Sequence, residues 1–196
     1  MSTALATGRR GAILDAALEL FNKRGFANVG ISDIVARAGA SVGSVYHHFG
    51  DKEGIAAAVY VEGMADYHRA LLRELERDRA TAEEAVKGLV RNHLRWVKRN
   101  RALARYLLTT RDPEVAGATG EALATMNRDV FHAVEEWLEA WAEAGEVRRL
   151  PLGLLHAVVL GPCQEFSRHW VAGRTKQSID EAEPVLADAA WKAVRA

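Results

Sequence analysis

The sequence predicts an all-α protein of about nine helices, arranged as a small N-terminal helix-turn-helix unit and a larger C-terminal helical block. Two observations predict this fold class. Apolar residues recur at the three- and four-residue spacing of amphipathic helices, and no strand-like alternation persists. Glycines, prolines and capping residues divide that pattern into segments of helical length. The 196 residues, 49% of them hydrophobic, suffice for one large core or two small ones.

Composition narrows the function classes. The 26 basic and 26 acidic residues cancel, so a nucleic-acid partner must be recognised through local charge and not through an overall basic excess. The single cysteine, Cys163, excludes an intrachain disulfide framework and is typical of a reducing compartment. Residues 1–10 lack the apolar core of a signal peptide, and the apolar stretch 150–163 is too short to span a bilayer. We therefore expect a cytoplasmic protein with no membrane partner.

Three short helices are expected within residues 9–50, and residues 1–8 are expected to be disordered. The first, 9–24, has an apolar stripe and stops at Gly25. The second begins after Gly30 as N-cap and ends at Gly39. Ser41 caps the third, which Phe49 and Gly50 close. Helices this short and this closely spaced form a unit that is marginal by itself.

A fourth helix is expected from Asp51 to about residue 77, and its apolar stripe changes face along its length. Ile55 and Val59 lie on one side, whereas Met64 and Tyr67 lie roughly 130° further round. A stripe that changes face indicates a helix shared by two cores. We place a domain boundary at the start of this helix, with an N-terminal domain at 1–52 and a larger C-terminal domain at 53–196.

The C-terminal block predicts five further helices. Their expected ranges are about 81–99, 101–110, 119–144, 151–172 and from Ser178 onward, with Pro113 in a loop. Ser178 and Glu181 form an S-x-x-E capping box for the last helix, and Pro184 marks a kink or a later start.

The third helix presents an unusual outer face. With Val45 and Phe49 turned inward, the outward direction falls on Gly43 and His47, flanked by Ser44 and Tyr46. A tight glycine turn followed by a helix with small and polar groups outward predicts a helix-turn-helix, whose second helix enters the DNA major groove. Lys52, at the start of the fourth helix, and Arg9 and Arg10, at the start of the first, are placed to contact phosphates or the minor groove.

The segment 9–55, RRGAILDAALELFNKRGFANVGISDIVARAGASVGSVYHHFGDKEGI, resembles the DNA-binding domain of the tetracycline-repressor (TetR) family. The match covers about a quarter of the chain and includes the Phe-x-x-x-Gly-Phe, Asp-Ile-x-x-x-Ala-Gly, Tyr-x-His-Phe and Lys-Glu elements. The resemblance implies a dimeric transcriptional regulator, usually a repressor, that a small molecule releases from an operator. The expected regulator needs no cofactor and no metal.

The resemblance implies that Ser44, Tyr46, His47, Lys52 and Val42 match DNA-contacting positions of the family, and the geometry of the short helices adds further candidates. The full expected set is Arg9, Arg10, Gly30, Ser32, Ser41, Val42, Gly43, Ser44, Tyr46, His47, His48 and Lys52. This chain departs from the family pattern at Gly30, where a threonine is common, and at Val42, where a polar residue is common. Gly30 therefore offers only its backbone and Val42 only apolar contact, which leaves both contacts open.

The predicted helix 151–172 is apolar nearly all round, so it must be covered on every side. In a chain of this size the expected second cover is another copy of the chain. Gly153, Ala157 and Gly161, four residues apart, allow a close approach, and Leu186 and Ala189 on the last helix extend the surface. A homodimer through four helices is expected.

Polar residues on otherwise apolar stripes predict an effector site. A ligand pocket is mostly apolar with a few orienting polar groups. The candidates are Tyr60, Met64, Tyr67, His93, Trp96, Asn127, Phe131 and His156. A buried histidine that only satisfies a backbone carbonyl, within ordinary core, is the competing interpretation.

An all-helical enzyme or scaffold without sequence-specific DNA binding is the alternative class. The chain has no G-x-G-x-x-G, P-loop, H-E-x-x-H or nucleophile elbow. Asp129 and His132 form a single acidic-x-x-His, whereas a di-iron bundle needs a pair of Glu-x-x-His motifs. We therefore expect no enzyme. The sequence leaves open the effector, the operator, the regulated genes and the choice between repression and activation.

Overall fold

The computed structural model describes residues 5, 7–110 and 113–196. These residues form ten α helices, one short 3-10 helix and no strand beyond a single bridge between Val147 and Arg195, which confirms the all-α prediction. The chain divides into two compact units, Met1–Asp66 with Asn100–Thr125 and Tyr67–Arg99 with Met126–Ala196. The division falls within two long helices, and the domain boundary after residue 52 stays a prediction. No helix in the described ranges combines the length and the apolar composition needed to cross a bilayer.

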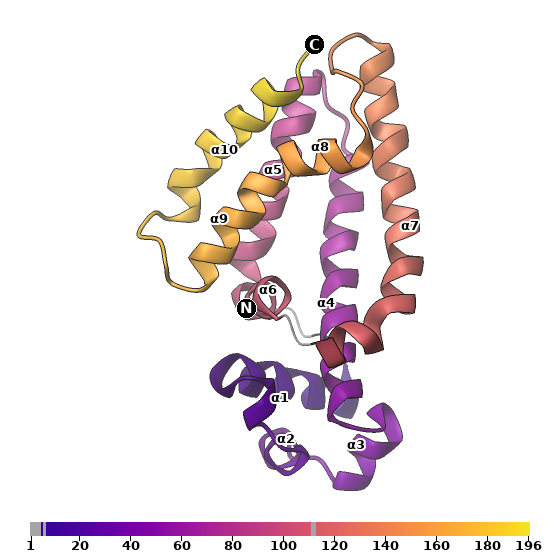
Figure 1. Ribbon diagram of the computed structural model, residues 1–196, viewed down its shortest axis with the longest axis vertical. Helices are drawn as coiled ribbons and strands as arrows, with labels where there is room; N and C mark the ends of the chain where they lie inside the picture. Colours follow the sequence, from indigo (N-terminus) through magenta and orange to yellow (C-terminus); the bar gives the residue numbers. More distant parts are fainter. Residues whose placement is uncertain (1–4, 6, 111–112) are drawn as a thin grey trace. The chain divides into compact units, whose positions relative to one another are not determined.

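The first unit contains the three short N-terminal helices, the first part of the long helix that follows them, and a later segment, Asn100–Thr125. Its elements are α1 (Gly8–Arg24), η1 (Phe26–Asn28), α2 (Ile31–Ala38), α3 (Val42–Phe49), α4 (Lys52–Leu75) as far as Asp66, α6 (Arg101–Thr109) and the first part of α7 (Pro113–Glu143). Figure 1 shows α1 packed against α2, with α3 following after a short turn. The stripe predicted on α1, which includes Ile13, Ala17 and Phe21, is buried.

Helix α6 completes the core of this unit. The Asn22 side-chain amide donates a hydrogen bond to the carbonyl oxygen of Ala102 (2.8 Å). The Tyr106 hydroxyl donates to the carbonyl oxygen of Ala56 on α4 (3.0 Å), and its ring stacks on Phe21. A three-helix unit that is marginal alone thus gains further apolar cover from α4 and α6.

Local capping sets the helix ends where the sequence predicts them. Gly39 adopts a left-handed conformation (φ 61°) after α2. The Ser41 hydroxyl accepts from the backbone N–H of Ser44 (3.2 Å), and the Asp51 carboxylate accepts from that of Gly54 (2.6 Å). These bonds satisfy N–H groups that the first turn of a helix cannot pair internally.

The second unit is a helical bundle around α5 (Ala82–Arg99). The other elements are the end of α4, the rest of α7, α8 (Leu152–Val159), α9 (Gly161–Val171) and α10 (Ile179–Val194). Figure 1 shows α10 alongside α5, with α8 and α9 next to them. Lys98 pairs with Asp180 (2.7 Å) and Lys87 with Asp188 (3.5 Å), so the two helices run antiparallel.

Three sequence predictions about helix bounds are wrong. The helix predicted at 151–172 is two helices, α8 and α9, separated at Leu160, because Pro162 has no N–H to bond the preceding turn and its ring disfavours a continuous helix. Pro113 begins α7 and does not lie in a loop, a common position for proline because the first helical N–H has no partner anyway. Gly8, within the segment expected to be disordered, already belongs to α1. Pro184 lies inside α10, which starts at Ile179.

Candidate DNA-recognition surface and effector residues

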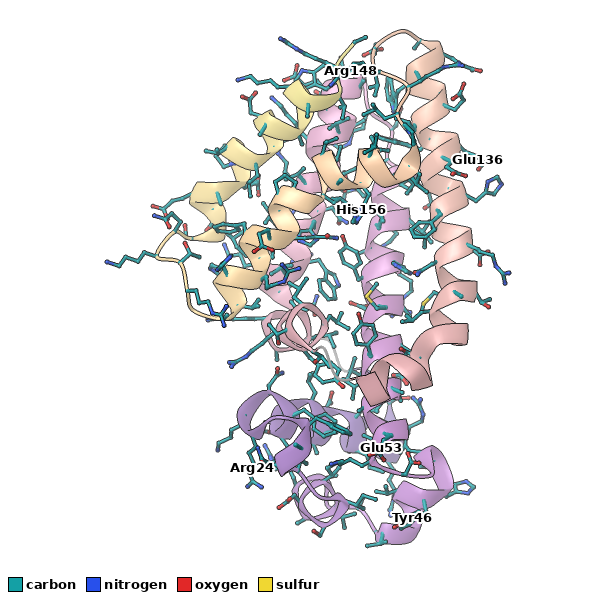
Figure 2. The ribbon with its side chains drawn as sticks, viewed as in Figure 1. Arg24, Tyr46, Glu53, Glu136, Arg148 and His156 are labelled. Atoms are coloured by element: carbon teal, nitrogen blue, oxygen red, sulfur yellow. The ribbon has the colours of Figure 1, made fainter. Side chains whose placement is uncertain are left out.

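Helix α3 buries one face and exposes the other, as its sequence predicts. Val45 is completely buried in the unit. Around it on the same helix, half of Val42 and 56% of Tyr46 are exposed, and His47 and His48 are exposed as well. Figure 2 places Tyr46 at the outer edge of its unit. The backbone of α3 is therefore anchored by Val45, while its outer side chains face solvent.

The glycine at the centre of this face has open space around it. A Cβ atom built on Gly43 would meet no other atom within 4 Å. The protein's own packing therefore does not require a glycine there, whereas a close approach to a partner would. Gly54, at the start of α4, is the opposite case, because a Cβ atom there would lie 2.0 Å from the carbonyl oxygen of Phe49.

The remaining positions expected to contact DNA fall into two groups. Gly30, Ser32, Ser41 and Arg9 are exposed, and Ser44 on α3 is half-buried. Two of the predicted cations, Arg10 and Lys52, have contacts within the chain. These contacts restrict where either cation can reach.

Lys52 lies against the short η1 helix. Its ammonium donates to the carbonyl oxygen of Phe26 (3.2 Å) and lies 4.2 Å from the centre of the Phe26 ring. An ammonium over an aromatic face is attracted by the negative face of the ring. Because lysine has three N–H donors, one bond to Phe26 leaves two for a phosphate.

Three of the predicted effector residues come together in the second unit. The Tyr67 hydroxyl lies 3.0 Å from Nδ1 of His93, and Nε2 of His93 lies 3.1 Å from the hydroxyl of Ser167. The Trp96 ring meets the Tyr67 ring edge-on, with centroids 5.1 Å apart. The result is a polar chain enclosed by aromatic rings.

Burial sets the protonation of this polar chain. It lowers the pKa of His93 to about 4, with a smaller contribution from the charge of His156, so His93 is neutral near pH 7. A neutral imidazole has one donor and one acceptor nitrogen, and both have hydroxyl partners here. Burial also raises the pKa of Tyr67 and brings that of the Cys163 thiol to about 12, so the thiol is unreactive.

Of the other predicted effector residues, His156 lies close enough to His93 for its charge to contribute to the lowered pKa of His93. Tyr60 and Met64 are half-buried in the first unit. In the second unit Asn127 is half-buried and 47% of Phe131 is exposed. His156, expected on an inner stripe, is exposed, and its Nε2 lies 3.1 Å from the side-chain nitrogen of Gln164, although partial burial still lowers the pKa of His156.

Sequence reasoning missed two polar residues in the second unit. Ser167 bonds His93 and is completely buried, and its position between Cys163 and Val171 at four-residue spacing is the signal that places it on the buried face of α9. His68 is 7% exposed, and its Nδ1 has no hydrogen-bond partner among the described residues. Its position next to Tyr67 on α4 gave no such signal.

The predicted dimer residues belong to a largely exposed apolar surface on α8, α9 and α10. Gly153, Ala157 and Ala189 are exposed, and Gly161 and Leu186 are half-buried. Beside them, Leu154 is 56% exposed and Val185 67% exposed. We name these seven residues of α8, α9 and α10 the apolar patch. Large aliphatic side chains this exposed, on helices that contact each other, are typical of an interaction surface.

Comparisons with known proteins agree with the helix-turn-helix. The family model described as bacterial regulatory proteins, tetR family, matches residues 13–59. The transcriptional repressor KstR2 of Rhodococcus jostii is 30% identical over 191 residues, which cover 96% of this chain and 79% of the relative.

Solved structures have the same fold over nearly the whole chain. The ketosteroid transcriptional regulator KstR2 of Mycobacterium tuberculosis matches with a TM-score of 0.74 and 19% identity, and each chain is covered completely. The Bacillus subtilis regulator FadR, solved in complex with stearoyl-CoA, matches with a TM-score of 0.75 and 21% identity, over 91% of this chain and 96% of the other. The chain belongs to the TetR family of bacterial transcriptional regulators and is not an enzyme.

Proposed function

We propose that the protein is a repressor that reads a two-fold symmetric operator with α3 and leaves it when a small apolar molecule binds. The observation that carries this proposal is the outer face of α3, where exposed Tyr46 and His47 flank a glycine with open space around it. Side chains of this kind supply hydrogen bonds and apolar contact to base edges. A bacterial regulator of this kind works on the chromosome, so we place it in the cytoplasm.

The experiment that tests DNA reading is selection of bound duplexes from a random library, followed by affinity measurements on the selected duplex and on a scrambled duplex. A repressor of this kind prefers the selected duplex by a factor of about a thousand or more. An enzyme or a scaffold binds both duplexes equally weakly. Equal binding would contradict the proposed function directly.

Contacts to base edges and contacts to phosphates can be tested separately on this surface. His47→Ala is expected to weaken operator binding by about 1–3 kcal/mol and to relax preference at one or two base pairs. Lys52→Ala is expected to weaken all duplexes alike and to reduce the salt slope by about 1 per subunit. A Lys52 variant that alters base preference and leaves the slope unchanged would show that its contact with Phe26, and not a phosphate, is its role.

We infer that the protein works as a homodimer through the apolar patch. Most of the patch is exposed in the single chain, and its small residues allow two helices to approach closely. A two-fold dimer presents two copies of α3, which must be spaced to meet successive major grooves, about 34–36 Å apart or another matched distance. Sedimentation of the protein at micromolar concentration measures the oligomeric state.

The effector is proposed to be a largely apolar molecule that contacts residues of α4, α5 and α7. The relatives support this class: one FadR structure contains stearoyl-CoA, and KstR2 is described as a ketosteroid regulator. Titration of stearoyl-CoA, with free coenzyme A as the control, into the complex with the selected duplex tests the acyl-CoA class. A ligand that lowers the affinity for DNA by some factor binds the free protein more tightly than the DNA complex by that same factor, because the two binding equilibria are linked.

A further inference from the structure

The side chain of Arg10 joins three helices of the first unit. It is carried by α1, and its Nη1 atom forms an ion pair with the carboxylate of Glu62 on α4. Its guanidinium carbon also lies 5.4 Å from the centre of the ring of Phe49, the last residue of α3. That distance is within the range of a cation–π interaction. One guanidinium therefore connects the end of the recognition helix to α4.

Arg9, the preceding residue, is a natural comparison. Consecutive positions on a helix point about 100° apart, so the two arginines face different surroundings. Arg9 is exposed, and no ion pair of Arg9 is found among the described residues. The Arg10 guanidinium already has a carboxylate that neutralises its charge, so a phosphate gains less from Arg10 than from Arg9, although some N–H donors of Arg10 remain. The two adjacent arginines therefore have different roles.

The contact lies at a place where a small rotation matters. Helix α3 has eight residues, so it is about 12 Å long. Phe49 is at one end, and Val42 and Gly43 are at the other. A tilt of about 10° at Phe49 displaces the far end by about 2 Å. Hydrogen bonds to base edges tolerate much less than that, because they weaken steeply outside their usual distances.

The junction after Phe49 limits some movements and permits others. The absence of a side chain at Gly54 lets the carbonyl oxygen of Phe49 approach α4 closely, which sets the separation of the two helices. Separation does not set orientation. The Phe49 ring held under the Arg10 guanidinium, which is itself held by Glu62, supplies a second point of attachment and so resists rotation.

We propose that Arg10 is a positioning residue for DNA recognition, which holds the end of α3 against α4 through Phe49 and Glu62, and that it is not a phosphate anchor. This proposal rests on the proposed reading of DNA by α3. It assigns Glu62 the same role from the other side of the ion pair, although its carboxylate is the wrong charge for a DNA contact. Arg9 keeps the electrostatic role.

The test compares Arg10→Gln, Glu62→Gln and the double variant, with Arg9→Gln as the matched control. Each is titrated with the duplex selected by the unmodified protein and with a scrambled duplex of the same length, over a series of salt concentrations. Arg10→Gln and Glu62→Gln are each expected to lower the selected-over-scrambled affinity ratio about two- to fivefold per subunit, with the salt slope unchanged. The double variant is expected to be no worse than either single variant, because the same pair is lost.

The control gives the opposite pattern. Arg9→Gln is expected to weaken binding to both duplexes, to reduce the salt slope by about 0.9 per lost phosphate contact and to leave the affinity ratio unchanged. Arg10→Lys keeps the charge, and we expect it to restore most of the ratio. Thermal melting of each variant verifies that the fold is intact.

Two results would overturn the proposal. In the first, Arg10→Gln weakens binding to both duplexes and reduces the salt slope, as expected for Arg9→Gln, while Glu62→Gln binds both duplexes more tightly because Arg10 is then free to contact a phosphate. The other is an Arg10→Gln ratio equal to that of the unmodified protein. Failure of the proposed function looks different, because the unmodified protein itself would then show no preference between the duplexes.

Discussion

Nδ1 of His93 lies 3.0 Å from the hydroxyl oxygen of Tyr67, and the ring is almost perpendicular to that of Tyr67, at 88°. The other ring nitrogen, Nε2, lies 3.1 Å from the hydroxyl of Ser167. The imidazole therefore lies between one hydroxyl from α4 and one from α9. All three groups can act as donor or acceptor when the histidine is neutral. A charged imidazolium could still donate to both hydroxyls, so burial, and not the loss of a hydrogen bond, disfavours the charged form of His93, which has consequences for stability.

The first prediction concerns pH. The pKa of His93 is lowered from 6.5 to about 4 in the folded protein, so the unfolded chain takes up the proton first as the pH falls. This group's contribution to stability is thus present above pH 6.5, is lost progressively as the pH falls from about 6.5 to about 4, and changes no further below that. The free energy of unfolding is expected to fall by about 2 kcal/mol between pH 7 and pH 5 on account of His93.

His93→Gln isolates this contribution. Glutamine can donate and accept but does not titrate, so the variant is expected to lose that part of the pH dependence. Urea unfolding at both pH values, at one fixed protein concentration, measures the difference. An equal pH dependence in the variant and the unmodified protein would show that His93 does not titrate in this way.

The second prediction concerns the open space around Gly43. Gly43→Leu is expected to abolish preference for the selected duplex while raising the free energy of unfolding slightly, because leucine is a better helix former than glycine. Gly43→Ala, which adds only a methyl group, is expected to retain part of the preference. The ratio of affinities for the selected and scrambled duplexes measures the preference, and thermal melting measures the stability of each variant. A Gly43→Leu protein that binds normally, or that unfolds, would show that this face of α3 does not approach DNA.

The third prediction concerns Gly54, where the protein itself leaves no room. The Cβ atom of Gly54→Ala would lie 2.0 Å from a backbone carbonyl oxygen, so the turn between α3 and α4 must shift. We expect a loss of about 1–3 kcal/mol in the free energy of unfolding and weaker operator binding. Gly43→Ala is the matched control for adding a methyl group to a helix. Similar melts for the two alanine variants would contradict the close packing at Gly54.

The fourth prediction concerns the apolar patch. Ala157→Arg is expected to prevent two copies from approaching, to give a folded monomer in sedimentation and to weaken operator binding strongly. Gln177→Arg adds the same charge in the exposed loop between α9 and α10 and is expected to remain dimeric. A dimer of Ala157→Arg with unchanged operator affinity would place the interface elsewhere.

Features that depend on residues three or four apart were determined by the sequence itself. The bond from Ser44 to Ser41, the left-handed Gly39 and the Ser178–Glu181 capping box all lie where the pattern predicts them. The physical reason is that a helix end is closed by neighbours along the chain. The inward Val45 and the outward Tyr46 follow equally from helical periodicity, and so does the recognition helix.

Only the tertiary structure decided which distant residues meet. Arg10 and Glu62 are 52 positions apart, and Tyr67 and His93 are 26 apart, so no local spacing could have paired them. Ser167 bonds His93 across 74 positions. The need for glycine at position 54 depends on where the Phe49 carbonyl lies, and the role of Arg10 depends on a carboxylate from another helix. Helix periodicity specifies which face is buried, but packing alone selects the partner on that face.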